Sequence, residues 1–349
     1  EKVTRFWLEN IGVDGFRVDA AKHLIEDGKV LDNTQATHDW FKGFYTFYKG
    51  INPNAFVVGE VSGSDARITE TYNKDQMDMI FNFEIASGFV NSANGGAISG
   101  VGSAITFIQK DAPDWDFATF LTNHDQNRVM STLGGNVDKA KIAAAMLLTS
   151  PGTPFIYYGE EVGMMGVKPD EAIRRPMQWT EGANAGFTTG TPWEALGENY
   201  LTSNVNTDES DKASLLNWYK RLIHLRLDNP ILSIGDYIPV KVDNPRVYAA
   251  IRQMQGEAVL VVINLSKNPI ADYTLAWEGY REGIDDVRYA TLLKQLADEA
   301  MAGDNYKAAL VAKKALIWLW LTDADTADLN SVRLEMIDHI MKIRKAMGK

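Results

Sequence analysis

Short apolar segments and longer amphipathic segments alternate along the first two thirds of the chain. The apolar runs predict strands, and they lie at residues 13–18, 55–58, 79–83, 117–122 and 154–159. Apolar residues at helical spacing predict helices, and these lie at residues 2–10, 38–49, 98–109, 139–149 and 215–226. Because parallel strands need long crossovers that are usually helical, this alternation predicts a parallel α/β fold.

Two architectures share this alternation, the (β/α)₈ barrel and the doubly wound open sheet. Each predicted strand is apolar almost throughout, as in a sheet that is covered on both faces. A doubly wound sheet usually carries a glycine-rich phosphate loop after its first strand, and none is found here. The barrel is therefore favoured, and its chemistry is expected at the carboxyl ends of the strands.

The pattern changes after about Ser233. Residues 237–242, 246–252 and 258–264 predict antiparallel strands, whereas the chain after about Trp277 is helical in pattern. We therefore expect three parts. They are a partial (β/α)₈ catalytic barrel at 1–233, an incomplete β domain at 234–275 and a helical tail at 276–349.

The composition of the chain indicates which classes of binding partner it disfavours. The formal net charge is −11, which disfavours nucleic acids and anionic membranes because both need clustered Lys and Arg. There are no cysteines, so disulfides and thiolate metal sites are excluded. No apolar run approaches the roughly 20 residues of a membrane span. A neutral substrate is compatible with this negative net charge.

Polar residues stand at the carboxyl ends of three predicted strands. Arg17 and Asp19 share one strand face, Glu60 follows an apolar run, and Asp125 stands beside His124. Taken singly, these residues also fit a structural ion pair, a solvated loop residue and an Asx turn. Their joint placement at parallel strand ends favours function.

Glycoside hydrolysis commonly uses two carboxyl groups, of which one is ionised and the other protonated. Arg17 would hold Asp19 ionised, since a nearby cation favours the charged carboxylate. We therefore expect Arg17 to compensate a buried anion. Desolvation after the apolar run would favour the neutral acid at Glu60.

Several segments resemble the α-amylase family of glycoside hydrolases. They are "GFRVDAAKH" (15–23), "VVGEV" (57–61), "FLTNHDQNR" (120–128), "GTPFIYYGEEVGM" (152–164) and "IRRPMQW" (173–179). The resemblance covers roughly residues 1–270 and is of the bacterial α-amylase and α-glucosidase type. It implies a (β/α)₈ barrel followed by a β-sandwich domain, and hydrolysis of α-glucosidic bonds with retention.

The resemblance also implies residue roles. Asp19 would be the nucleophile, Glu60 the general acid and base, and Asp125 the group that stabilises the transition state. The implied substrate-binding residues are Arg17, Lys22, His23, His124 and Arg128. Retention predicts that the carboxyl groups of Asp19 and Glu60 lie about 5–5.5 Å apart.

Two parts of the family pattern are absent. No Asn-His signature of the third barrel strand precedes Asp19, so the matched strands are strands four to eight and a longer parent protein is expected. That parent would supply most ligands of a structural calcium, to which His23 could add its carbonyl. After Leu275 the β pattern stops, which indicates either a join between unrelated sequences or a lineage-specific helical tail.

The expected function is hydrolysis of α-1,4-glucosidic bonds in starch-like glucans or maltooligosaccharides, with no cofactor required for the chemistry. The alternatives are an α-glucosidase or transglycosylase of short oligosaccharides, and an inactive fragment of such an enzyme. The residues leave the compartment open, and degradation of a polymer would favour an extracellular or periplasmic location.

Overall fold

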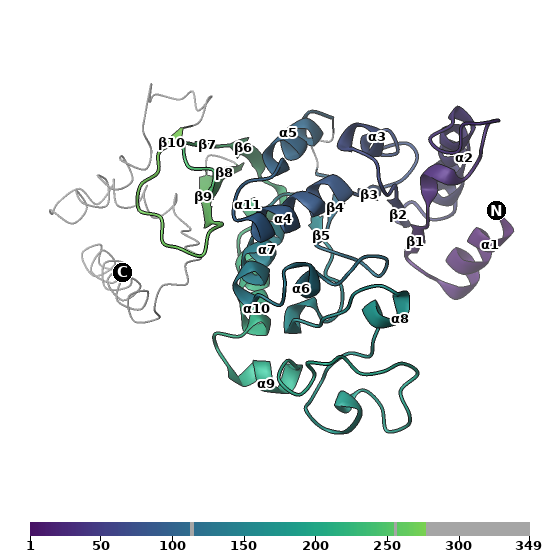
Figure 1. The fold of residues 1–349 in the computed structure, drawn as a ribbon. Helices are drawn as coiled ribbons and strands as arrows, with labels where there is room; N and C mark the ends of the chain where they lie inside the picture. The colour runs from purple at the N-terminus through teal and green to yellow at the C-terminus, as the bar shows by residue number, and fades with distance from the viewer. Residues whose placement is uncertain (112–114, 255–256, 277–349) are drawn as a thin grey trace, which may run out of the picture.

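A parallel sheet of five strands forms the centre of the computed structural model, which describes residues 1–111, 115–254 and 257–276 (Figure 1). The strands are β1 (Gly15–Val18), β2 (Phe56–Glu60), β3 (Met79–Phe81), β4 (Phe117–Thr119) and β5 (Thr153–Pro154). Their order in the sheet is β1-β2-β3-β4-β5. Strand order thus follows chain order, and this sheet lacks the reversal that defines a doubly wound sheet.

Helices connect these strands and cover them. The α-helices are α1 (Lys2–Arg5), α2 (Gln35–Ile51), α3 (Ala66–Glu70), α4 (Phe83–Gly95), α5 (Val101–Asp111), α6 (Val129–Thr132), α7 (Val137–Thr149), α8 (Asp170–Ile173), α9 (Val205–Ser210), α10 (Leu215–Asp228) and α11 (Ile231–Ile234). The other helical turns are η1 (Phe6–Ile11), η2 (Ala21–His23), η3 (Glu160–Val162) and η4 (Ala183–Gly186). The predicted helices at 2–10, 38–49, 98–109, 139–149 and 215–226 are confirmed, with shifted ends.

Three strand predictions for the parallel sheet were too long, and the strand expected at 117–122 ends at Thr119. The strand expected at 79–83 ends at Phe81, because the Asn82 side chain accepts a hydrogen bond from the backbone N–H of Ile85 at 2.9 Å and caps α4. The strand expected at 154–159 ends at Pro154. The segment beyond it leaves the sheet, and Tyr157 and Tyr158 pack on Arg128 instead.

The apolar core lies on both faces of the sheet but is uneven. One large cluster joins α4, α5, α7 and α10 to β8 and β9, and a second joins α2 to β1 and β2. A small cluster of Val58, Met79 and Ala118, with Phe81 and Phe155 packed against it, lies between neighbouring strands. The expectation of full coverage is wrong for β1, in which no residue is buried, because an edge strand has only one neighbour.

The predicted antiparallel strands are confirmed as β6 (Asp236–Pro239), β8 (Val247–Met254) and β9 (Glu257–Asn264). A second pair consists of β7 (Lys241–Val242) and β10 (Leu275–Ala276). Buried Arg252 of β8 joins this part to the parallel sheet region, since it donates to the carbonyl of Thr149 at the end of α7 at 3.1 Å. The predicted helical tail lies outside the described residues, apart from Ala276 in β10.

No helix in the described part of the chain is long and apolar enough to cross a membrane.

Candidate active site

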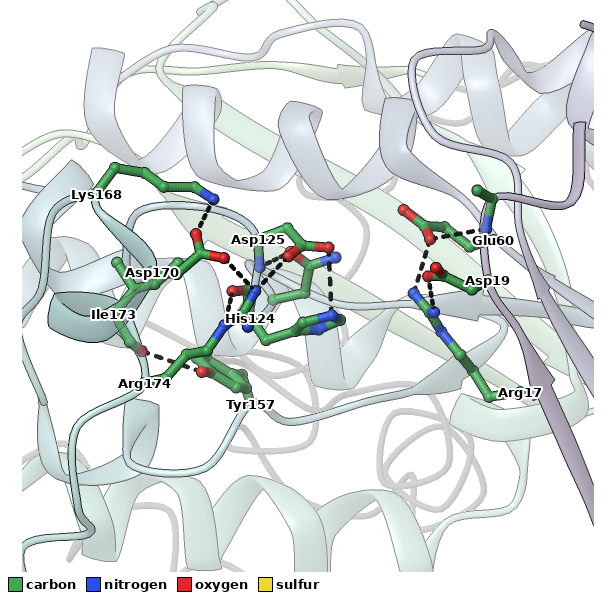
Figure 2. Close-up of polar contacts among 12 residues, drawn as sticks. Arg17, Asp19, Glu60, His124, Asp125, Tyr157, Lys168, Asp170, Ile173 and Arg174 are labelled. Carbon is green, nitrogen blue, oxygen red and sulfur yellow. Dashed lines mark hydrogen bonds and ion pairs between the residues drawn. The ribbon is translucent and has the colours of Figure 1, made fainter. Parts of the chain in front are cut away.

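Arg17 joins two carboxyl groups at the carboxyl ends of β1 and β2 (Figure 2). Its Nη1 donates to Asp19 Oδ1, and its Nη2 donates to Glu60 Oε2 at 2.8 Å. The backbone N–H of Ala20 also donates to Glu60 Oε2, at 3.3 Å. Because β1 and β2 are parallel neighbours with Val18 opposite Gly59, their next residues emerge side by side. Sequence-distant acids therefore meet on one guanidinium.

The two carboxyl groups differ in exposure. The Glu60 side chain is 10% exposed, whereas the Asp19 side chain is 76% exposed. The expectation that Arg17 compensates a buried anion is therefore wrong. Asp19 follows the end of an edge strand, and the described residues leave its carboxylate in solvent.

Hydrogen bonding lowers the pKa of Asp19. The bond from Arg17, and then hydrogen bonding with Glu60, hold the pKa of Asp19 below its usual range. The positive charge of Arg17 adds to this effect, as does a smaller contribution from His124. Asp19 is thus held as the anion at neutral pH.

Asp125 and His124 form a second group of side chains after β4 (Figure 2). Arg174 Nη2 donates to Asp125 Oδ1 at 2.7 Å, and Arg174 Nε donates to the carbonyl oxygen of His124 at 2.9 Å. His124 Nε2 lies 3.2 Å from Asp125 Oδ2. Arg174 also pairs with Asp170 at 2.8 Å.

Lys22 and His23 lie in η2, directly after β1. Lys22 Nζ pairs with Asp32 at 3.3 Å, and the Nδ1 atom of His23 lies 3.1 Å from the carbonyl oxygen of Leu31. Both side chains thus contact the segment that leads into α2. Their proposed substrate contacts stay predictions.

Arg128 does not lie on the surface of the site. It is 2% exposed, and its Nη1 donates to the carbonyl oxygen of Tyr158 at 2.7 Å. The expected sugar contact of Arg128 stays a prediction, and its burial points first to a role within the fold.

Sequence reasoning missed Arg174. The segment "IRRPMQW" (173–179) was among the matching motifs, but no role was given to its arginines. Arg174 is 49 residues from Asp125, so only the fold brings them together. Its place in a motif that resembles a glycoside hydrolase family is the signal from which a role near the acids could have been predicted.

Glu160 is a buried acid next to this region. It is 3% exposed, and Tyr219 of α10 donates its hydroxyl to Glu160 Oε1 at 3.0 Å. Burial raises the pKa of Glu160 to about 8, against an ordinary value of 4.5. Glu160 is therefore largely protonated in the folded protein at neutral pH.

We expect Glu160→Gln to flatten the dependence of stability on pH. Because the pKa of Glu160 is raised on folding, its contribution is fully present below the unfolded pKa and is lost as pH rises towards about 8. The loss is on the order of a few kcal/mol. Thermal melts of both proteins between about pH 5 and about pH 8 measure it. Parallel curves for the two proteins would show that Glu160 does not titrate in this way.

Among the described residues, no group of three or more His, Cys, Asp or Glu side chains could hold a metal ion.

Comparison with known proteins places this arrangement in a family. The sequence model of the α-amylase catalytic domain matches residues 1–235. Alpha-amylase 3 of Dictyoglomus thermophilum is 37% identical over 273 residues, which cover 76% of this chain and 52% of that protein. An oligo-1,6-glucosidase of Bacillus cereus is 27% identical over 332 residues, covering 76% of this chain and 59% of its own.

Solved structures agree with the sequence comparison. The α-amylase from H. orenii superposes with a TM-score of 0.67 at 34% identity, covering 77% of this chain and 54% of that one. A parallel α/β sheet with acids at its strand ends thus defines the class of fold. The chain belongs to the α-amylase family of glycoside hydrolases. It spans about half the length of the first of these curated relatives.

Proposed function

We propose that this chain carries the acid pair of a retaining glycoside hydrolase that acts on α-1,4-glucosidic bonds of starch-like glucans or maltooligosaccharides. The observation that carries the proposal is the single guanidinium of Arg17 bound to both Asp19 and Glu60. We further propose that the five parallel strands are strands four to eight of a (β/α)₈ barrel. Their sequential order supports this placement.

In this proposal, Asp19 attacks the anomeric carbon while Glu60 gives its proton to the departing glycosidic oxygen. A covalent glycosyl ester then forms on Asp19. Glu60, now ionised, takes a proton from water, which attacks the ester and restores both acids. Asp125 lies beside the sugar and stabilises the positive charge that develops in each transition state.

Retention is supported by the guanidinium that the two acids share. Asp19 and Glu60 both accept from Arg17, which keeps their carboxyl groups near each other. Inverting enzymes separate these groups by about 6.5–9.5 Å to admit a water molecule. Two carboxyl groups held on one guanidinium favour direct attack by Asp19.

The relatives supply the alternative functions. Their names include oligo-1,6-glucosidase and trehalose-6-phosphate hydrolase, and one structural neighbour is an isomaltulose synthase. We therefore keep an α-glucosidase or transglycosylase of short oligosaccharides as the second candidate. An inactive fragment is the third, since the chain spans only part of these relatives. No cofactor enters the proposed chemistry, and a structural calcium stays a proposal for a longer protein.

Chromatography of products tests the proposed specificity. The 349-residue chain is incubated separately with soluble starch and with maltose. We expect maltooligosaccharides from starch and little change in maltose. Rapid release of glucose from maltose would indicate an α-glucosidase, longer oligosaccharides would indicate a transglycosylase, and no product from either would indicate an inactive fragment.

We expect Arg17→Gln to move the acid limb of the kcat/KM profile to higher pH. Without the hydrogen bond and charge of Arg17, the pKa of Asp19 rises towards its ordinary value of 3.8. The wild-type limb lies below that value, because the pKa of Asp19 is lowered. Profiles of kcat/KM against pH for both proteins measure the difference. Arg5→Gln, which removes an exposed ion pair with Glu9, is the control. An acid limb that stays in place would contradict the assignment to Asp19.

A further inference from the structure

Arg128 packs against two aromatic rings, those of Tyr157 and Tyr158. Its guanidinium carbon is 4.6 Å from the ring centre of Tyr157 and 4.6 Å from that of Tyr158. Its Nη1 also donates to the Tyr158 carbonyl. The planar guanidinium thus fixes the two rings and the backbone of the segment that follows β5.

The two tyrosine hydroxyls extend from Arg128 towards Arg174. Tyr157 donates its hydroxyl to the carbonyl oxygen of Ile173 at 3.0 Å, and Tyr158 donates to the carbonyl oxygen of Arg175 at 2.7 Å. These carbonyl groups belong to the residues directly before and after Arg174. The rings that pack against Arg128 therefore hold the backbone of Arg174 from both sides.

Arg174 in turn holds Asp125, as Figure 2 shows. Its Nε bond to the His124 carbonyl and its Nη2 bond to the Asp125 carboxylate fix that residue in backbone and side chain. Arg128 follows Asp125 by three positions in the same loop. The contacts therefore form a closed ring that begins and ends at this loop.

We propose that Arg128 is a positioning residue, which sets the place of Asp125 through Tyr157, Tyr158 and Arg174. This inference rests on the proposed function of Asp125 in the transition state. The planar guanidinium lies 4.6 Å from both ring centres, whose planes differ by 69°, while its Nη1 donates to a carbonyl. The compact ammonium of lysine has no such plane.

Kinetics test this role. Arg128→Lys is expected to lower kcat by about 100-fold with KM nearly unchanged, because a small displacement of a group that acts in the transition state costs about that much. Tyr157→Phe and Tyr158→Phe each remove one hydroxyl and are expected to lower kcat by about tenfold. Tyr48→Phe removes a buried hydroxyl bound to Asp78, remote from this ring, and should leave kcat unchanged.

A double substitution separates positioning from general structural support. If Arg128 acts through Arg174, Arg128→Lys should add little to the loss already caused by Arg174→Lys. Fully additive losses would overturn the proposal. So would an equal rise in KM and fall in kcat for both tyrosine variants.

A spectroscopic measurement decides the inference even if the chain is inactive. In protein labelled with ¹⁵N at arginine, the Nε–H of Arg174 should give a signal protected from exchange by its bond to the His124 carbonyl. We expect that signal to shift and lose protection in Tyr157→Phe and Tyr158→Phe, and to stay unchanged in Tyr48→Phe. An unchanged signal in both tyrosine variants would overturn the proposed chain of contacts from Arg128 to Asp125. Absent wild-type turnover alone would instead contradict the proposed function.

Discussion

Replacing Asp19 with asparagine is expected to lower kcat on maltooligosaccharides by about 10⁴-fold or more. The amide keeps the size of the side chain but cannot form the glycosyl ester, and loss of a covalent nucleophile in other hydrolases has effects of this size. Because the Asp19 side chain is 76% exposed, the substitution should leave folding intact. Initial rates and a thermal melt of the variant measure both effects.

Asp14→Asn is the matched control for this variant. Asp14 is another exposed aspartate, and it lies just before β1, at the opposite end from Asp19. Its replacement should leave kcat within about twofold of wild type, as expected for a surface change away from the site. A variant without Asp19 that keeps a tenth of wild-type kcat would remove this residue from the role of nucleophile.

Glu60→Gln is expected to lower kcat by roughly 10²- to 10⁴-fold on natural oligosaccharides. Their leaving group is a sugar alkoxide, which needs a proton from Glu60. An aryl glycoside with an acidic phenol leaving group needs no such proton, so formation of its glycosyl ester should be nearly unaffected. Burst kinetics with a dinitrophenyl α-glycoside measure that step.

The difference between substrates is the diagnostic result for Glu60. Glu9→Gln, at an exposed position in η1, should leave both substrates unaffected. If Glu60→Gln slowed the ester-forming step equally for the aryl and natural substrates, Glu60 would act by position or charge and not as the acid.

Much of the first acid pair could be predicted from sequence. The apolar runs before Asp19 and Glu60 predicted two neighbouring parallel strands, and parallel strand ends lie at one edge of a sheet. The alternation of side chains along β1 also placed Arg17 and Asp19 together. The alternation of side chains could not predict how exposed Asp19 is, because its exposure depends on which residues lie beyond the edge strand.

The second group depended on contacts that span long stretches of chain. Arg174 reaches Asp125 across 49 residues, and Arg128 reaches the Tyr158 carbonyl across 30. The spacing of residues within one helix or strand does not predict contacts of this kind. The resemblance implied a sugar contact for Arg128, whereas its burial depends on two aromatic rings in a segment that leaves the sheet after a very short strand.

Helix α4 was not among the helices predicted from the sequence. Its sequence contains Gly88 and several serine and asparagine residues, which lower helical propensity. Tertiary packing overrides that weakness, since Ile85 and Phe89 are fully buried in the large core cluster. The signal that was present is Asn82, a favourable N-cap residue directly before the helix.

Trapping of the covalent intermediate tests the central claim most directly. The chain is incubated with a fluorinated α-glucosyl fluoride, which forms the glycosyl ester faster than water removes it, and its peptides are analysed by mass spectrometry. The account predicts one added fluoroglucosyl group, on the peptide that contains Asp19, and no label in Asp19→Asn. A label on Glu60, on Asp125 or on no residue would contradict it.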